Sequence, residues 1–227
     1  MRSATDGIFG RDKGVWEIDM QEMTKEQFDA FLTAAKAGDP VAQFEIAVCY
    51  ENGTVVEQNH KKALRWYKKS AKRGYKEAQN SLGYAYDSGS AGKQKPKKAA
   101  RWYRRAAMQD HAVAEYNLGQ YYESLLNYDM AFYWYKKAAA QGDPDAQYSL
   151  GHFYCTGKGV TADTTAGAAW FLKAAEQDNA SAQYIMGVFY SEGKGVKCDL
   201  VQSEYWLTRA AQQGHKKAIE RLGEDET

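Results

Sequence analysis

The chain has 227 residues, of which 44% are hydrophobic and 26% charged, a composition typical of globular proteins and not of disordered chains. Its 30 basic and 29 acidic side chains give a net charge of +1, which excludes the strong overall positive field of many nucleic-acid-binding proteins but allows a local basic patch. No window approaches the roughly 18 consecutive apolar residues of a membrane span, and the first residues contain no apolar run of about seven that could form a signal-peptide core. We therefore expect a cytoplasmic protein that does not bind membranes.

Two sets of residues recur at one spacing and reveal an internal repeat. Five tryptophans are separated by 36, 32, 36 and 36 residues, and each is followed four and five residues later by two small residues; they are Trp66, Trp102, Trp134, Trp170 and Trp206. Alanines recur at a matching spacing as Ala42, Ala78, Ala114, Ala146, Ala182 and Ala218. In the first five copies an apolar residue follows the alanine after four residues and a tyrosine after eight, which predicts one stripe of a helix. Each unit of about 36 residues therefore contains a first helix through its alanine and a second helix through its tryptophan.

Capping signals set the boundaries of these helices. Residues 24–27, "TKEQ", fit a capping box that starts an extra helix of the second type. Residues 1–23 before it are expected to form an arm or an irregular N-terminal cap. The tripeptide "GDP" at 38–40 and 142–144 places an aspartate cap before a proline at the first helical position. The repeats are expected to fill residues 24–223, with a final half-unit at 215–223, and residues 224–227 to form a polar tail. Second helices should end near Gly74, Asp110, Gly142, Asp178 and Gly214.

Glycine recurs inside the first helices, at positions 83, 119, 151 and 187. A glycine within a helix costs roughly 1 kcal/mol relative to alanine, so its return needs a reason in packing. We expect the paired helix to approach closely at each of these glycines.

The third copy is four residues shorter than the others and contains the aromatic stretch "YYESLLNYDMAFYWYKK" at 121–137. Tyr122, Trp134 and Tyr135 occupy ordinary repeat positions there. Tyr128, Phe132 and Tyr133 have no aromatic counterpart in the first two copies, which hold Leu64 or Ala100 and Arg65 or Arg101 at the positions of Phe132 and Tyr133. We expect these three rings to seal the shortened turn, and an exposed patch is the alternative.

Motifs that carry chemistry are weak in this sequence. "GKGV" at 157–160 and 193–196 lacks the G-x-x-x-x-G-K-[ST] pattern of a phosphate loop, and it lies between two helices, so it is expected to be an ordinary connection. Cys49, Cys155 and Cys198 are far apart and in no C-x-x-C pair, which favours free thiols. None of the four histidines has a second histidine or cysteine at helical metal-site spacing. We therefore expect no catalytic residue, no cofactor and no metal.

A basic strip with aromatic residues runs from His60 to Gln79, "HKKALRWYKKSAKRGYKEAQ". Such a mixture can bind RNA. Trp66 and Tyr67 are repeat positions, however, so we expect the rings to face the core and the lysines to face water, without nucleic-acid binding.

The repeat pattern closely resembles that of the Sel1-like repeats, relatives of the tetratricopeptide repeats. Two copies carry it nearly intact: "AQYSLGHFYCTGKGVTADTTAGAAWFLKAAEQD" from Ala146 and "AQYIMGVFYSEGKGVKCDLVQSEYWLTRAAQQG" from Ala182. The resemblance implies an all-α, right-handed superhelical solenoid of about five helix–turn–helix repeats with terminal capping helices. It also implies that the protein acts by binding other proteins, with the first helices lining the concave face.

A solenoid binds through the positions that its repeat leaves free. On each first helix the residues three, six and ten after the alanine lie away from the repeated stripe and change between copies. They are Glu45, Val48, Asn52, Ser81, Tyr84, Ser88, Asn117, Gln120, Ser124, Ser149, His152, Thr156, Ile185, Val188 and Glu192. We expect them to contact a protein partner of a monomeric chain; the other interpretation is that they are merely exposed to solvent.

Two functions follow from these expectations. The first is a non-catalytic scaffold or adaptor that holds a protein partner on the concave face. The alternative is an immunity-type protein that binds and neutralises a bacterial toxin or effector enzyme.

Overall fold

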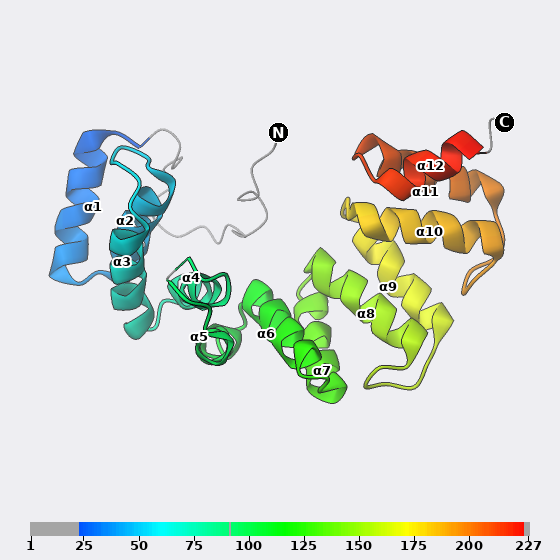
Figure 1. Cartoon of the computed structure of the whole chain (residues 1–227), viewed down its shortest axis with the longest axis horizontal. Helices are drawn as coiled ribbons and strands as arrows, with labels where there is room; N and C mark the ends of the chain where they lie inside the picture. The colour runs from blue at the N-terminus through cyan, green and yellow to red at the C-terminus, as the bar shows by residue number, and fades with distance from the viewer. Residues whose placement is uncertain (1–22, 91, 225–227) are drawn as a thin grey trace. The chain divides into compact units, whose positions relative to one another are not determined.

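The structure, a computed structural model, describes residues 23–90 and 92–224, and these form twelve α-helices and no strand (Figure 1). The helices are α1 (Lys25–Ala37), α2 (Pro40–Asn52), α3 (His60–Lys72), α4 (Lys76–Asp87), α5 (Pro96–Ala107), α6 (Ala112–Ser124), α7 (Tyr128–Ala140), α8 (Pro144–Thr156), α9 (Thr164–Glu176), α10 (Ala180–Glu192), α11 (Leu200–Gln212) and α12 (Lys216–Glu224). The expected all-α repeat fold is confirmed. Of the expected N-terminal arm, residues 1–22 lie outside the described residues, as do residues 225–227 of the expected tail.

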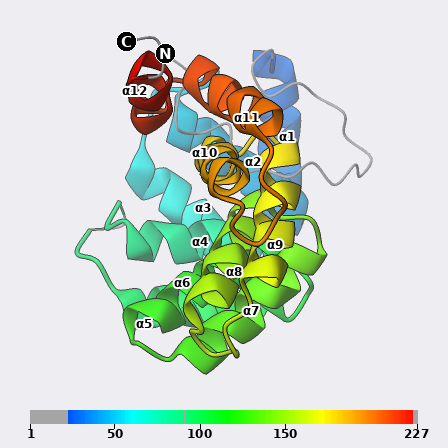
Figure 2. The same ribbon diagram turned by 90° about the vertical axis from the view of Figure 1, so that its right-hand side faces the viewer.

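The chain divides into two compact units, Met1–Ala114 and Glu115–Thr227, so the boundary falls within α6. In the first unit each helix from α1 to α5 packs against the next, and in the second unit the same holds from α7 to α12 (Figure 2). First helices (α2, α4, α6, α8, α10, α12) thus alternate with second helices (α1, α3, α5, α7, α9, α11). Every repeat is a helix pair, as the spacing predicts.

Local capping explains where these helices begin. The Thr24 side chain accepts a hydrogen bond from the Gln27 backbone N–H, and the Gln27 side chain accepts one from the Thr24 N–H, which completes the predicted capping box. Asp39 and Asp143 each cap a helix that opens with proline. Helix starts predicted from "GDP" are therefore correct.

The chain turns sharply after each second helix because one residue there adopts a positive φ. Glycine fills this place at Gly74, Gly142 and Gly214. Asp110 and Asp178 fill it in the second and fourth repeats, with φ of 53° and 62°. Aspartate tolerates this left-handed conformation better than most residues with a side chain. The predicted second-helix ends are confirmed within a few residues.

The glycines inside the first helices make room for a bulky side chain of the paired helix. A Cβ placed on Gly151 would lie 2.7 Å from Cδ1 of Phe171, and one placed on Gly119 would lie 2.6 Å from Cδ1 of Tyr135. Tyr103 and Leu207 fill the same place against Gly83 and Gly187. The predicted close approach is confirmed, and the side chain that fills the space is the residue after each tryptophan.

The shortened third repeat joins α6 to α7 through residues 125–127, with Leu126 at a φ of 58°. The Tyr128 and Phe132 rings are partly buried and pack edge-on against Phe153 and Tyr154, with centroids 6.1 and 5.5 Å apart. Tyr133 is 51% exposed. Sealing of the turn is therefore confirmed for two of the three rings and wrong for Tyr133.

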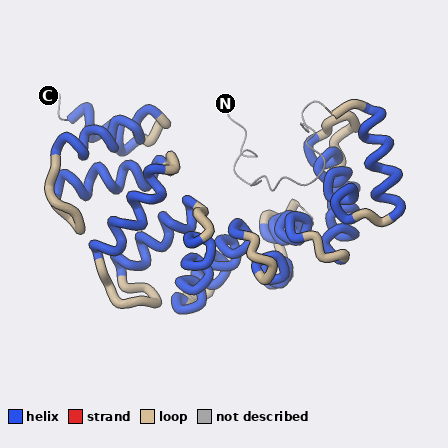
Figure 3. The backbone as a smooth tube through the Cα atoms, turned by 180° about the vertical axis from the view of Figure 1, so that it is seen from behind, coloured by secondary structure: helices blue, strands red, loops and turns tan. Residues whose placement is uncertain are grey.

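The "GKGV" segments lie in the longer loops between α8 and α9 and between α10 and α11 (tan in Figure 3). Gly159 and Gly195 have positive φ, and a Cβ placed on them would collide with the backbone carbonyls of Tyr128 and Thr164, respectively. The Lys158 ammonium lies 3.5 Å from the Glu123 carboxylate. These contacts account for both glycines and one lysine as parts of the fold.

Among residues 23–90 and 92–224, no helix has both the length and the apolar character needed to cross a membrane.

Candidate functional site

The residues predicted to bind a partner lie on the first helices but differ in exposure. Eight are exposed: Asn52, Tyr84, Ser88, Gln120, Ser124, His152, Thr156 and Glu192. Five are partly buried: Glu45, Asn117, Ser149, Ile185 and Val188. Val48 and Ser81 are buried and contribute almost no surface. We call the other thirteen residues the first-helix surface.

In the first unit, Tyr84 is the largest side chain of this surface and is 46% exposed. Glu45, on α2, is partly buried, and its burial together with the nearby Glu77 carboxylate raises its pKa to about 7. This carboxyl group therefore changes its charge near neutral pH.

In the second unit, tyrosines organise the polar side chains of the surface. Gln120 donates a hydrogen bond through Nε2 to the Tyr116 hydroxyl at 2.9 Å. The His152 ring meets the Tyr148 ring edge-on with centroids 4.8 Å apart and also contacts Phe171. Desolvation of the ring lowers the pKa of His152, although the residue as a whole is exposed. A neutral imidazole and an amide beside aromatic rings can make hydrogen bonds and apolar contacts at once, but they do not form a catalytic set.

Beneath the surface, acidic side chains accept hydrogen bonds from buried tyrosines. The Tyr67 hydroxyl donates to Glu51, and the Tyr135 hydroxyl donates to Glu123 at 2.8 Å. Burial, followed by the neighbouring Glu51 carboxylate, raises the pKa of Tyr67, so the hydroxyl stays protonated. These pairs join the end of a first helix to the middle of its second helix.

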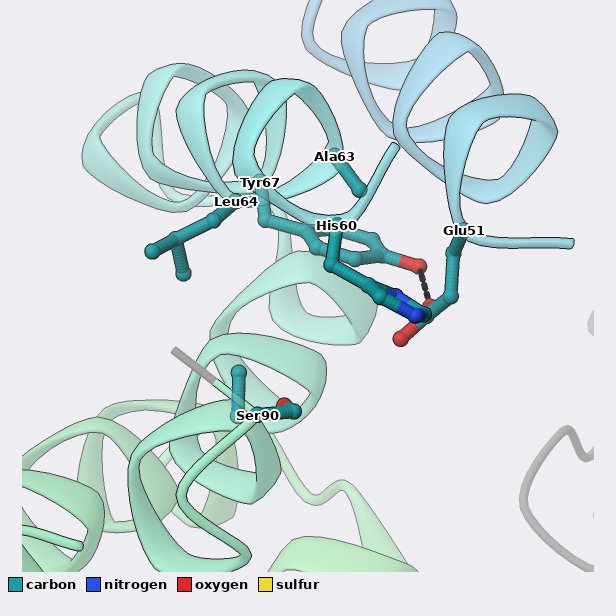
Figure 4. A pocket seen from close by; sticks show the side chains of 7 residues that line it. Glu51, His60, Ala63, Leu64, Tyr67 and Ser90 are labelled. Carbon is teal, nitrogen blue, oxygen red and sulfur yellow. Dashed lines mark hydrogen bonds between the residues drawn. The ribbon is translucent and has the colours of Figure 1, made fainter. Parts of the chain in front are cut away.

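The Tyr67–Glu51 pair borders a small cavity that His60 and Ser90 also line (Figure 4). Its volume of about 10 Å³ is at the lower limit for one water molecule, far below the roughly 300–1,000 Å³ of ligand pockets. A hollow of about 440 Å³ in the second unit is lined by residues of α11 alone, including Val201, Tyr205 and Arg209, and lacks an opposite wall. Neither space suits a small-molecule substrate.

A ladder of side-chain amide pairs, each joining the first helix of a repeat to the end of its own second helix, was missed by the sequence reasoning. Gln79 accepts a hydrogen bond from Gln109 at 2.9 Å, and the pairs Gln147–Gln177 and Gln183–Gln213 repeat this bond at 2.8 Å. The acceptor always follows the repeat alanine, and the donor stands seven residues after the tryptophan. The recurrence of glutamine at both positions in three repeats could have predicted these hydrogen bonds from the sequence.

Glu115 replaces glutamine in one rung of the ladder. Its fully buried carboxylate accepts a hydrogen bond from Gln141 at 2.6 Å and lies 2.9 Å from the Lys137 ammonium. A buried carboxylate requires such compensation. Glu115 is therefore part of the framework and not a candidate catalytic group.

The remaining reactive side chains are scattered. Cys49, Cys155 and Cys198 are free thiols, as predicted. Within the described part of the chain, histidine, cysteine and acidic side chains form no group of three or more that could hold a metal ion.

Comparisons with known proteins agree with this architecture. A Sel1 repeat protein from Oxalobacter formigenes is 32% identical, with a TM-score of 0.77, over 88% of this chain and 78% of its own. The protective antigen c5321 of uropathogenic Escherichia coli, which has an SLR fold, is 34% identical, with a TM-score of 0.83, over 89% of this chain. Only 45% of c5321 is covered, so the chain spans about half the length of that protein.

A more distant similarity concerns the fold alone. The immunity protein PA5088 from Pseudomonas aeruginosa is 20% identical, with a TM-score of 0.57, over 84% of this chain and 74% of its own. A search of curated proteins gave no match. The Sel1 repeat model matches residues 40–75, 76–111, 112–143, 144–179 and 180–215, which together make up more than half of the chain. The chain therefore belongs to the Sel1 repeat family.

Proposed function

We propose that this protein is a non-catalytic scaffold that holds a protein partner on its first-helix surface. Sel1 repeat proteins generally act as scaffolds for protein interactions. One observation supports this proposal most strongly. The residue six positions after the repeat alanine differs from copy to copy, whereas the alanine, tyrosine and tryptophan positions around it recur. Tyr84, Gln120 and His152 occupy this position and are exposed.

The chemistry of these side chains suits a protein partner. Tyrosine, histidine and glutamine combine apolar or planar groups with hydrogen-bonding atoms, as residues at protein interfaces often do. Both cavities described above are unsuited to a small substrate, and this also favours a binding function.

The test is affinity capture by the full chain from extracts of its native cell, followed by measurement of Kd with the purified partner. Replacing Tyr84, Gln120 and His152 together by glutamate should weaken binding by about 100-fold or more, because aromatic and hydrogen-bonding contacts of both units are lost and charge is introduced. The matched control replaces Tyr133, Thr165 and Ala169, which are exposed on second helices, by glutamate. The proposal fails if no stable partner is captured, or if the control variant loses as much affinity as the first-helix variant.

Neutralisation of a toxin is the narrower alternative. It is supported by a fold shared with the immunity protein PA5088, although at 20% identity that similarity concerns the fold alone. Co-expression with the product of a neighbouring gene decides between the two functions. Rescue of cells from that product supports the narrower role, and absence of toxicity or of a tight complex excludes it.

A further inference from the structure

Two neighbouring second helices in the first unit carry many cations and no acidic residue. We call the following ten residues the basic patch: Lys61, Lys62, Arg65, Lys68 and Lys69 on α3, and Lys97, Lys98, Arg101, Arg104 and Arg105 on α5. All are exposed except Lys68, which is partly buried. Because the net charge of the whole chain is only +1, the residues outside these helices are net negative.

The two rows of the basic patch meet at one side chain. Both α3 and α5 pack against α4, which lies between them in the sequence. The Lys68 ammonium lies 5.8 Å from the centre of the Tyr86 ring on α4, and the Lys98 ammonium lies 5.9 Å from the same centre. The cations of α3 and α5 therefore form one surface.

Comparison of the repeats distinguishes cations that recur in every repeat from cations that occur in only some repeats. A lysine or arginine stands three residues after every repeat tryptophan and lies over its ring, as Lys69 does over Trp66 at 4.0 Å and Arg105 over Trp102 at 4.4 Å. Lys137, Lys173 and Arg209 repeat this contact in the later copies. These cations belong to the repeat framework.

Three other positions of the patch are basic only in the first two repeats. They lie five, four and one residues before the tryptophan and hold Lys61, Lys62 and Arg65 in the first repeat and Lys97, Lys98 and Arg101 in the second. Later repeats hold Asp129, Met130 and Tyr133, then Thr165, Ala166 and Ala169, then Val201, Gln202 and Tyr205. The same helix pair thus forms without cations at these positions, although Lys62 and Lys98 also lie over the Tyr50 and Tyr86 rings.

These cations also work against the stability of their own helices. Lys61 and Arg65, and likewise Lys97 and Arg101, are like charges four residues apart on one helix face, which is unfavourable. No carboxylate of the described residues lies within 4.0 Å of any of the four. Neither helix stability nor an ion pair within the described residues explains these four cations.

We propose that the basic patch binds an acidic segment of a protein partner. Arginine and lysine side chains on two helices that both pack against α4 suit the carboxylates of a glutamate- or aspartate-rich helix or tail, and arginine can bind a carboxylate through two parallel hydrogen bonds. This surface lies on second helices, so it is distinct from the first-helix surface.

Two features favour a protein over other polyanions. Single-stranded nucleic acid binds by stacking bases on open aromatic faces, but Trp66 and Trp102 already hold Lys69 and Arg105 on one side and pack against the core on the other. The residues outside α3 and α5 are net negative, so the chain lacks the broad positive field that favours binding to an extended duplex or an anionic membrane. A short acidic segment needs to contact the patch alone.

The test uses fluorescence anisotropy of the full chain with a labelled glutamate-rich peptide at physiological salt. In the patch variant, Lys61, Arg65, Lys97 and Arg101 are replaced by glutamine. In the matched control, the exposed Lys136, Lys197, Lys216 and Lys217 are replaced by glutamine, which changes the net charge equally. We expect the patch variant to lose about tenfold or more in affinity for the peptide and the control less than twofold. Lysines that lie farther than a Debye length of about 8 Å from the bound peptide are screened by salt and contribute little.

Two further measurements make the result decisive. The patch variant should melt at the same temperature as the parent chain or higher, which shows that it folds. The first-helix variant with glutamate at Tyr84, Gln120 and His152 should keep its affinity for the peptide. The basic-patch proposal and the scaffold proposal can therefore be refuted separately. Equal loss in both glutamine variants overturns the proposal. Tighter patch-dependent binding of an oligonucleotide of equal charge, or of phosphatidylserine vesicles, also overturns it.

Discussion

Replacement of Gly151 by alanine tests the packing that defines each repeat. A Cβ at this position would lie 2.7, 2.8 and 2.9 Å from Cδ1, Cε1 and Cγ of Phe171, closer than carbon atoms can approach. The Phe171 ring is only 1% exposed and also contacts Phe189 edge-on. It therefore has no free space into which to move, and the helix pair must separate.

The expected loss of stability is the difference between two effects. Overpacking a filled core costs about 1–3 kcal/mol. Removing a helical glycine gains up to about 1 kcal/mol, since alanine is the better helix former. We therefore expect Gly151→Ala to lower the free energy of unfolding by about 1–2 kcal/mol and Tm by roughly 2–8 °C.

The assay is urea denaturation followed by far-UV circular dichroism, with Gly223→Ala as the matched control. Gly223 occupies the same repeat position on α12, but nothing lies within 4 Å of a Cβ placed there. The control should be neutral or slightly stabilising. A Gly151→Ala variant as stable as the parent chain would refute the argument that a bulky neighbour, and not local backbone preference, selects glycine.

Three other predictions concern buried polar groups. Tyr135→Phe removes the hydrogen bond to Glu123 and should lower the free energy of unfolding by about 1 kcal/mol in urea denaturation. Lys137→Met should cost about 3–5 kcal/mol in the same assay, because the buried Glu115 carboxylate loses its cation, whereas Glu115→Gln should cost much less. Because the pKa of Glu45 is raised from 4.5 to about 7, the folded state binds more protons than the unfolded state between these values. Stability should therefore fall as pH rises from about 5 to about 8, and Glu45→Gln should flatten this dependence in melts at a series of pH values.

The sequence predicted the helices well because their signals are local. Caps such as Thr24 and Asp39 act within one helical turn, and the alanine and tryptophan stripes follow from the helical period. The predicted surface was less accurate because its exposure depends on neighbouring helices. Val48 is buried in a cluster with Phe44 and Tyr67, whereas Tyr84, at the same repeat position, is exposed.

The repeats of this chain act as internal comparisons that separate framework from function. Glu51 and Glu123 pair with buried tyrosine hydroxyls, and where the second helix has Phe171 or Leu207 instead, the acidic residue is replaced by Cys155 or Ser191. A change at one partner accompanied by a change at the other indicates a structural pair.

Four cations of the basic patch, Lys61, Arg65, Lys97 and Arg101, vary without any such compensation. Arg65 and Arg101 correspond to Tyr133, Ala169 and Tyr205 in the later repeats, and the helix pair beneath them stays the same. A position that varies on a constant framework is not set by the fold, so it is a place where a binding function can act. The same criterion applies to Tyr84, Gln120 and His152 on the first helices. The proposals for the first-helix surface and for the basic patch thus use one argument, but each is tested by its own binding experiment and either can be wrong alone.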